Sequence, residues 1–422
     1  MQKLSKHKIY IGENPLLLQF SVKNFRSFEK EEVLNLSAGK GSELRDSNTF
    51  ESSQNQRLVR SAVIYGPNAG GKSNLIRAIF FLQQFVLASS TAYQEKQKIP
   101  LQPFRLNAKS QNEPSEFSID FVCNDVRFTY HLALTEDQII SEELYAYPKN
   151  YRQTWFTRKW NPSSKTYDWY QGPSFKGEHK VWEQMTRANA LYLSTAVQFN
   201  SEQLKPIFLW FRDQLVILLK NGPIQEIYFN PDLTFQFLKD PKTAPWIHKF
   251  MECADIGIEN FHLIEEEVPP LKKVAVRTQH KMLDSDQKVF FDLFLDESDG
   301  TQRLFSQAGG WLKALREGLV LFVDELDLHL HPNIVRYLIE LFHSPKTNQK
   351  NAQLIFTTHD TSLLDSDLFR RDQVWFIQKD EQQASRLYSL LDFKPRKGEA
   401  IGKGYLQGRY GALPFIGKFR FS

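Results

Sequence analysis

The segment Gly66 to Ser73, GPNAGGKS, constrains this chain more than any other feature of its sequence. It matches G-x-x-x-x-G-K-[ST] in full, follows an apolar segment (59–65), and precedes residues whose apolar positions recur at helical spacing. Small residues let successive backbone N–H groups turn toward phosphate oxygens, and a helix start adds positive potential. A Gly-rich turn could match by chance, but the strand before it and the helix after it are the context that the motif requires. The sequence therefore predicts a nucleotide-phosphate site at a strand-to-helix junction.

Residues of this loop have distinct predicted roles. Lys72 would contact the β- and γ-phosphates, and the hydroxyl of Ser73 would bind magnesium. ATP and Mg²⁺ are accordingly the predicted cofactors. The predicted nucleotide-binding residues of the loop are Gly66, Asn68, Gly70, Gly71, Lys72, Ser73 and Asn74.

Two adjacent carboxylates end the buried strand LVLFVDE (319–325). Asp324 would hold magnesium, and Glu325 would orient or deprotonate the attacking water. An acidic turn at a strand end is the simpler interpretation of such a pair taken alone. The phosphate loop upstream favours the catalytic one.

Two further segments are candidates for the same site. His359 follows the strand QLIFT (353–357), where its imidazole could reach a γ-phosphate from the same sheet edge, although a lone histidine is more often structural. In the segment SDGTQR (298–303), small residues before a helix could bind an anion or simply cap the helix. Asp327, His329 and His331 resemble a metal site, but the absence of further ligands nearby favours a role in shaping the loop after Glu325.

Bulk composition limits the class of protein. The 422 residues are 41% hydrophobic and 24% charged, which suits two or three folded units, and the net charge of +4 shows no whole-molecule basic field. Two dispersed cysteines, Cys123 and Cys253, indicate a reducing compartment. The sequence shows no apolar run long enough to span a bilayer. We therefore expect a cytoplasmic protein without a membrane partner.

Hydrophobic periodicity divides the chain into five predicted parts. Residues 1–100 form an N-terminal lobe with the phosphate loop, and 101–175 alternate with period two, as in an antiparallel sheet. Residues 176–285 are predicted to be a mostly helical insert, with WFRDQLVILL (210–219) as its clearest helix. Residues 286–390 return to an α/β pattern with buried strands typical of a parallel sheet, and 391–422 form a Gly-rich tail.

Taken in order, the segments NFRSF, GPNAGGKSN, ESDGTQR, LVLFVDELDLHLHP and TTHD resemble the ABC-type ATPases, within the soluble branch of RecF, SMC and OLD proteins. The resemblance implies an α/β fold, with an ABC-type core of mostly parallel sheet, an antiparallel β subdomain and an inserted helical domain. It also implies that Ser298 and Gly300 contact the γ-phosphate held by another protomer, so that the chain acts as a homodimer or a higher even-numbered oligomer. Gln102 is the candidate for the family's magnesium-sensing glutamine.

A closer likeness, which includes PFRL, EPSEFSIDF and GYLQGRYGALPFIG, is to bacterial ATPases of the RloA and abortive-infection type. It implies an ATP-driven sensor or scaffold in anti-phage defence, whose nuclease-like or TOPRIM-like effector is a separate polypeptide. A RecF-like ATPase of DNA repair or chromosome maintenance, with nucleic acid as a direct partner, is the alternative. The large inserts argue against a subunit that energises a membrane transporter.

Overall fold

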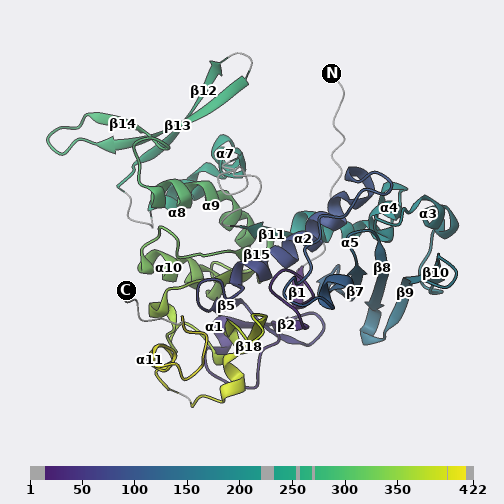
Figure 1. Ribbon diagram of the computed structural model, residues 1–422. Helices are drawn as coiled ribbons and strands as arrows, with labels where there is room; N and C mark the ends of the chain where they lie inside the picture. Colours follow the sequence, from purple (N-terminus) through teal and green to yellow (C-terminus); the bar gives the residue numbers. More distant parts are fainter. Residues whose placement is uncertain (1–14, 220–231, 253–256, 269–270, 397, 415–422) are drawn as a thin grey trace, which may run out of the picture.

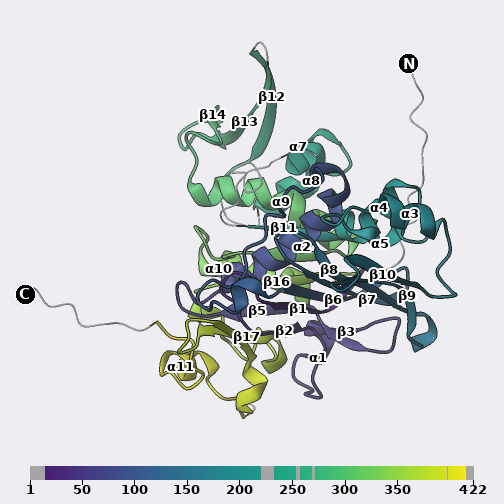
Figure 2. The same ribbon diagram turned by 45° about the vertical axis from the view of Figure 1, so that its right-hand side comes forward.

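The structure is a computed structural model of the 422-residue chain, and it describes residues 15–219, 232–252, 257–268, 271–396 and 398–414. Two large sheets form its centre, with a long helix between them (Figures 1 and 2). A three-stranded arm projects from one end of the molecule (Figure 1). The chain is thus a mixed α/β protein, as the sequence predicts.

The first sheet is parallel except at one edge and has the order β11-β15-β16-β5-β17-β18. Only the last pair, β17 and β18, is antiparallel. The predicted strands at 319–325 and 353–357 both lie in this sheet, as does the apolar segment 373–377. Its strands are β5 (Ser61–Tyr65), β11 (Leu215–Leu218), β15 (Val320–Val323), β16 (Gln353–Thr357), β17 (Val374–Lys379) and β18 (Ser385–Ser389).

The second sheet is antiparallel and has the order β10-β9-β8-β7-β6-β1-β2. Its strands are β1 (Leu16–Lys23), β2 (Glu32–Asn35), β6 (Ser115–Cys123), β7 (Val126–Leu134), β8 (Ile139–Tyr147), β9 (Gln153–Asn161) and β10 (Thr166–Gln171). Because β6 pairs with β1 along its length, the period-two strands continue the N-terminal hairpin instead of forming a separate insert. Alternation along a strand identifies its two faces but not its neighbours, so the sequence could not show this pairing.

Helix α2 (Lys72–Ala92) starts at the phosphate loop and packs between the two sheets. Alternate residues of β5 serve two cores, because side chains point to opposite faces of a strand. Ala62 and Ile64 join the core that contains α2, whereas Val63 and Tyr65 join the core on the other face. Within the described part of the chain, α2 is also the one helix long and apolar enough to cross a membrane, and half of that stretch is buried, as in a core helix.

Helices α8 (Ala244–Glu252), α9 (Asp299–Glu317) and α10 (Pro332–His343) contribute to the core on that other face. The predicted Gly-rich tail contributes to it too, through the short helix α11 (Ile401–Leu406) and the buried ring of Tyr410. The described part of this segment is therefore an ordered piece of the core. Aromatic stacking contributes to this packing, since the ring of Phe376 stacks on those of both Tyr405 and Tyr410.

The structure corrects two predictions for residues 176–285. The segment WFRDQLVILL is not one helix: Trp210–Gln214 form a π-helical turn and Leu215–Leu218 form β11 at the edge of the parallel sheet. Short apolar runs fit either state, and pairing with β15 decides in favour of the strand. Further on, β12 (Asn260–Val268) and β13 (Leu271–Lys281) form with β14 (Lys288–Asp292) the projecting arm, so this part of the insert is sheet.

The remaining described elements are short and lie between these parts. They are α1 (Arg45–Asn48), β3 (Thr49–Glu51), β4 (Arg57–Val59), α3 (His179–Met185), α4 (Tyr192–Gln198), α5 (Lys205–Leu209), α7 (Asp232–Lys239) and single 3₁₀ turns at Ser110–Asn112, Pro148–Asn150, Thr361–Leu363, Arg371–Gln373 and Leu390–Phe393.

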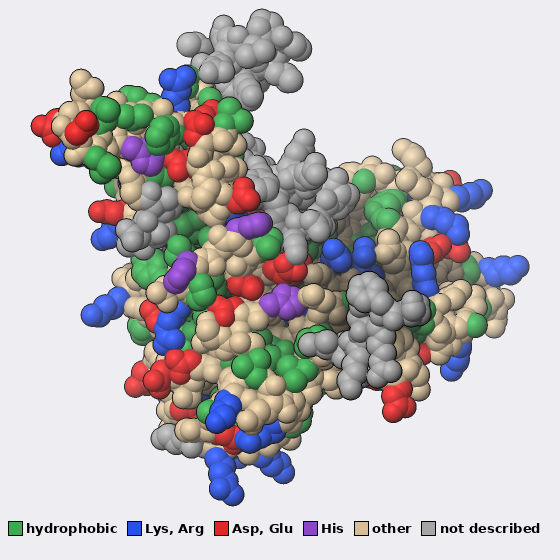
Figure 3. Space-filling model, turned by 60° about the vertical axis from the view of Figure 1, so that its left-hand side comes forward, with side chains coloured by type: hydrophobic (Ala, Val, Ile, Leu, Met, Phe, Trp, Pro, Cys, Tyr) green, Lys and Arg blue, Asp and Glu red, His purple; other side chains and the backbone are tan. Residues whose placement is uncertain are grey.

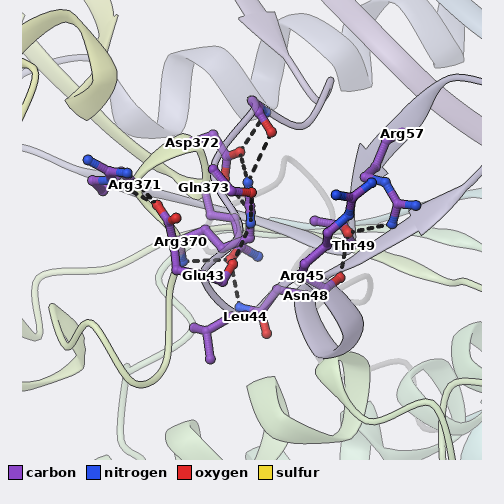
Figure 4. A network of polar contacts seen from close by, with 12 residues as sticks. Glu43, Leu44, Arg45, Asn48, Thr49, Arg57, Arg370, Arg371, Asp372 and Gln373 are labelled. Atoms are coloured by element: carbon purple, nitrogen blue, oxygen red, sulfur yellow. Dashed lines mark hydrogen bonds and ion pairs between the residues drawn. The ribbon is translucent and has the colours of Figure 1, made fainter. Parts of the chain in front are cut away.

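A buried polar network anchors the loop before α1 to the start of β17 (Figure 4). Arg370 is 1% exposed, and its guanidinium donates from Nε to Asp372 (2.9 Å) and from Nη1 to the carbonyl of Gly41 (3.0 Å). Arg371 donates to the carboxylate of Glu43 (2.8 Å). A buried ion pair is tolerated when its remaining hydrogen-bonding capacity is satisfied, as it is here by loop carbonyls. The network joins segments some 330 positions apart in the sequence.

Candidate functional site

Three adjacent parallel strands, β15, β16 and β5, carry the acidic pair, His359 and the phosphate loop beyond their carboxyl ends. Ligands of open α/β sheets bind outside that edge. The strands bring the phosphate loop, Glu325 and His359 around one open hollow of about 330 Å³. Its lining residues are Ser27, Pro67, Asn68, Ala69, Gly70, Gly71, Lys72, Ser73, Asn74, Arg77, Glu325, His359 and Lys379.

The glycines of the loop are required by close approaches of neighbouring backbone. A Cβ at Gly66 would lie 2.1 Å from the carbonyl oxygen of Ile377 on β17, which no real Cβ contact allows. Gly71 has a φ of +122° and would place a Cβ 2.2 Å from Oγ of Ser385. The Ser385 hydroxyl in turn donates to the carbonyl of Gly70 (2.7 Å). The loop is therefore held against β17 and β18 in a shape that glycine alone permits.

Lys72 is 5% exposed and its ammonium group bonds to its own loop. Nζ donates to the carbonyl of Gly66 (2.7 Å) and more weakly to that of Pro67 (3.3 Å). These bonds hold the positive charge over the hollow, where a phosphate oxygen would be a stronger acceptor than a neutral carbonyl.

Asp324 is buried beneath the hollow, at 1% exposure. Its Oδ1 accepts hydrogen bonds from the hydroxyls of Ser73 (3.0 Å) and Thr357 (2.8 Å). Burial raises the pKa of Asp324 above its ordinary value, and the two hydrogen bonds only partly oppose this. The predicted pair of magnesium-binding residues, Ser73 and Asp324, is thus in direct contact.

Glu325 leaves the strand with a φ of +51°, a conformation that is unusual for a residue with a side chain. Two neighbours hold it there. Its N–H donates to Oγ1 of Thr357 (2.7 Å), and its carbonyl accepts from Nη2 of Arg303 on α9 (2.8 Å). Strained backbone that is fixed by its surroundings is common at functional sites. Thr357 therefore orients both acidic residues at once.

His359 lies at the rim of the hollow with an exposed side chain. Its backbone N–H donates to Oδ2 of Asp327 (3.3 Å), which ties the histidine loop to the loop after Glu325. In that loop, His331 caps α10 by accepting from the N–H of Asn333 (3.2 Å) at Nδ1. Among the described residues no group of three His, Cys, Asp or Glu side chains is placed to hold a metal ion alone.

Ser298 and Gly300 lie outside the hollow of their own chain. Ser298 is exposed and caps α9, accepting from the N–H of Thr301 (3.2 Å). A Cβ at Gly300 would lie 2.5 Å from the carbonyl oxygen of His329, so the first turn of α9 packs closely against the loop after Glu325. The segment is thus a helix start, as its capping pattern indicates, and it contributes no group to the hollow within this chain.

Gln102 does not line the hollow either. It lies in a neighbouring depression of about 290 Å³ that shares Ser27, Asn74 and Lys379 with it. Its carbonyl accepts from the N–H of Arg26 (2.7 Å). The proposed contact between Gln102 and magnesium remains a prediction.

Several residues of the site have no role in the predictions from sequence. Thr357, Arg77 and Lys379 lie in ordinary positions of a strand or helix and show no motif of their own. Ser27 belongs to the segment NFRSF, and its Oγ accepts from Asn74 (2.8 Å) in the phosphate loop. That segment was the one available signal, since it belongs to the ordered set of motifs in the family resemblance.

Comparisons with known proteins extend these observations. Residues 61–365 match a family model described as "AAA domain, putative AbiEii toxin, Type IV TA system". No curated protein matches the chain. Among solved structures, the SMC head domain from Thermotoga maritima aligns over 88% of this chain and 98% of its own, with 13% identity and a TM-score of 0.41.

The family model includes β5, the phosphate loop, both acidic residues and His359, and it covers well over half of the chain. Within the matched residues, the structure has a strand, the phosphate loop and a helix in the order that nucleotide binding requires. The chain therefore belongs to the AAA-domain family of the AbiEii type.

Proposed function

We propose that the protein hydrolyses ATP as an ABC-type ATPase whose sites are shared between two protomers. The observation that carries this proposal is the convergence of the phosphate loop, Glu325 and His359 on one hollow. In that hollow the loop N–H groups and Lys72 would hold the phosphates, and Asn74 lies where the loop enters α2.

The side chains beneath the hollow fit Mg²⁺. This ion keeps several waters and takes one or two protein oxygens together with substrate phosphates, so a three-ligand protein site is not needed. Ser73 and Asp324 would provide those oxygens, and Gln102 is a further candidate. A bound Mg²⁺ would neutralise charge on the phosphates. It would also offset the burial of the Asp324 carboxylate.

Glu325 is the proposed general base. The residue lines the hollow together with the phosphate loop, and its backbone is fixed on both sides by Thr357 and Arg303. His359 would contact the γ-phosphate from the next strand. A base must lie within hydrogen-bonding reach of the water that it activates, and a fixed backbone keeps it there.

Replacing Asp324 by Asn is expected to stop hydrolysis while making the nucleotide-free protein more stable. The pKa of Asp324 is raised in the folded chain, so at neutral pH the ionised carboxylate opposes folding, and this loss of stability sets in as the pH rises through the raised pKa. Asn keeps an oxygen acceptor for Ser73 and Thr357 without the charge. We expect Tm at pH 7 to rise by roughly 1–3 °C, and this gain to vanish in acid.

Thermal unfolding at pH 7 and pH 4, with phosphate release measured in parallel, tests this. Asp372→Asn is the contrasting variant. The Asp372 carboxylate is paired with the buried Arg370, so its removal should lower Tm. A lower Tm for Asp324→Asn at pH 7 would contradict the assigned environment of Asp324.

The exposed start of α9 supports the shared site. Ser298 and Gly300 have no access to the hollow of their own chain, yet they pack against the loop that follows Glu325. In a two-fold dimer each chain could present this helix start to the nucleotide of the other. ATP would then hold the protomers together, and hydrolysis would loosen them.

Dimer formation tests the shared site directly. The Glu325→Gln protein with ATP and Mg²⁺ should run as a dimer or higher even-numbered oligomer by light scattering after gel filtration, and as a smaller species without ATP. Adding Ser298→Arg to the same chain should reduce this ATP-dependent assembly. A molecular mass that stays the same with and without ATP, and with and without Ser298→Arg, would refute ATP-mediated assembly.

We further propose that this ATPase is the sensor or scaffold of a bacterial anti-phage system with a separately encoded nuclease-like or TOPRIM-like effector. The family description, "putative AbiEii toxin, Type IV TA system", supports a defence role. Purification from the native host should recover such an effector, encoded next to this chain.

A RecF-like role in repair or chromosome maintenance is the alternative. It requires direct DNA binding, and the net charge of +4 offers no strong general attraction. On the face shown in Figure 3, acidic and histidine side chains gather near the middle of the molecule, while Lys and Arg lie mostly toward its margins. Salt-sensitive binding of duplex DNA by the ATP-bound dimer, without an effector, would favour this alternative.

A further inference from the structure

A second cavity of about 440 Å³ lies between the outer side of α2 and the loop that follows β1. This volume is within the usual range for small-molecule sites. The side chains that define its chemistry are those of Arg26, Arg77, Phe80, Phe81, Gln84 and Tyr93. No residue of the phosphate loop from Gly66 to Asn74 lines it, and of the described residues Arg77 alone lines both this cavity and the hollow described above.

The cavity carries positive charge that its own walls do not neutralise. Among the described residues that line it there are two arginines and neither Asp nor Glu. In the described part of the chain, Nε of Arg26 is buried without a hydrogen-bond partner, and Arg77 donates to the neutral amide of Asn74 (3.2 Å). Burial, and then the charges of Arg77 and Arg105, lower the pKa of Arg26. Guanidinium groups held together in this way favour a bound anion, above all phosphate.

Aromatic rings form the rest of the wall. Phe81 stacks on Phe85 with 5.6 Å between ring centroids and 9° between planes, and Phe85 meets the ring of Tyr93 edge-on at 5.9 Å. Phe80, Phe81 and Tyr93 are only partly buried, so part of each remains accessible from the cavity. Aromatic side chains beside arginines are the combination that binds nucleobases and their phosphates.

We propose that this cavity binds a second nucleotide, distinct from the ATP on the phosphate loop. Its phosphate would pair with Arg26 and Arg77, its base would pack on the aromatic wall, and the exposed amide of Gln84 could hydrogen-bond a base edge. A free mononucleotide and the 5′-phosphorylated end of a nucleic-acid strand share this chemistry. The site goes beyond the proposed ATPase, and its binding does not depend on hydrolysis.

Arg77 connects the two sites. It bonds to Asn74 beside the phosphate loop, and it lines both the hollow and the second cavity. An anion in the second cavity would pair with the same Arg77 guanidinium. The second nucleotide is therefore placed to affect the ATP site, as a signal to a sensor would be.

Calorimetric titration tests the proposal. The protein is saturated with a non-hydrolysable ATP analogue and Mg²⁺, and AMP or a 5′-phosphorylated single-stranded dT oligomer is then added. We expect one further molecule to bind per chain. Binding of AMP but not of the oligomer would identify a free nucleotide as the ligand. Tighter binding of the phosphorylated oligomer than of the same oligomer without its phosphate would identify a strand end.

Gln84→Glu provides the sharpest variant, because this exposed residue can change without disturbing the core. A carboxylate there would repel the phosphate and pair with the arginines, and binding should weaken about 10-fold or more. Gln349→Glu is the control, since Gln349 is equally exposed and lies far along the chain in the loop after α10. ATP-analogue binding should be the same in both variants.

Arg26→Asn is the second variant. Asn tolerates the positive φ of Arg26 (+51°), so the loop can keep its shape, which Tm would verify, while the phosphate loses one partner. Weaker binding of AMP or of the phosphorylated oligomer would support the site. Unchanged binding in both variants, competition with the ATP analogue, or no binding at millimolar concentrations would overturn it.

Discussion

The Glu325→Gln protein is expected to bind ATP as tightly as the wild type and to hydrolyse it about 100- to 10,000-fold more slowly, the range for losing a general base. Glu325 acts on water in the proposed mechanism, so binding does not depend on its charge. The bonds that fix it use only main-chain atoms of Glu325, which accept from the Arg303 side chain and donate to the Thr357 hydroxyl, so they survive the change. The hollow should keep its shape.

Lys72→Ala is expected to show the opposite pattern. The buried ammonium of Lys72 is the charged group that the loop holds over the hollow, and its loss removes a contact to phosphate in the bound state itself. Lys72→Ala should therefore weaken ATP binding itself, whatever its effect on turnover. Titration with ATP and Mg²⁺, followed by phosphate release at saturating ATP, separates the two variants.

Exposed residues of the same types supply controls. Glu340→Gln removes a carboxylate on the surface of α10, and Lys346→Ala removes an ammonium group in the loop after it. Both should bind and hydrolyse ATP normally. Equal loss of ATP binding in the Lys72 and Glu325 variants would show that the two residues do not have separate roles.

The sequence is sufficient to predict that the phosphate loop, the acidic pair and His359 share one sheet edge, because each motif is local. The phosphate loop, the acidic pair and His359 each follow a short apolar strand, and parallel strands bring their carboxyl ends to one sheet edge. Each residue could therefore be placed from a few neighbours in the sequence. The contact of Ser73 with Asp324, 251 positions apart, follows from that arrangement.

What the sequence could not supply depends on pairing between distant segments. β11 resembled a helix because four apolar residues have no period, and only β15 beside it makes it a strand. Ser385 shapes the phosphate loop from a strand more than 300 positions away. The aromatic cavity beside α2 is also hidden, since its helical residues fit an ordinary buried face until the loop with Arg26 closes over them.

The exposed helix start at Ser298 leads to the second prediction. Ser298 contributes nothing to the hollow of its own chain, so in a shared site it would act on the nucleotide bound by the other protomer. Ser298→Arg should abolish hydrolysis and leave ATP binding largely intact. Since Ser298 also caps α9, Ser298→Asp is needed beside it: Asp keeps a capping acceptor but brings negative charge toward a phosphate. Loss of activity in both variants, with normal Tm for Ser298→Asp, would assign the defect to the nucleotide.

Mixing inactive chains then distinguishes a shared site from a separate one. In a dimer of one Lys72→Ala chain and one Ser298→Arg chain, one composite site carries both defects and the other carries neither. Random pairing makes half of the dimers mixed, each with one intact site of two, so about one quarter of wild-type activity should return if the sites act independently. A mixture of Lys72→Ala with Glu325→Gln chains is the control, since both changes lie on the same side of the site and no intact site can form. Failure to recover activity where mixed dimers demonstrably form, or full activity in Ser298→Arg alone, would show that each chain completes its own site and that the start of α9 serves only as a helix cap.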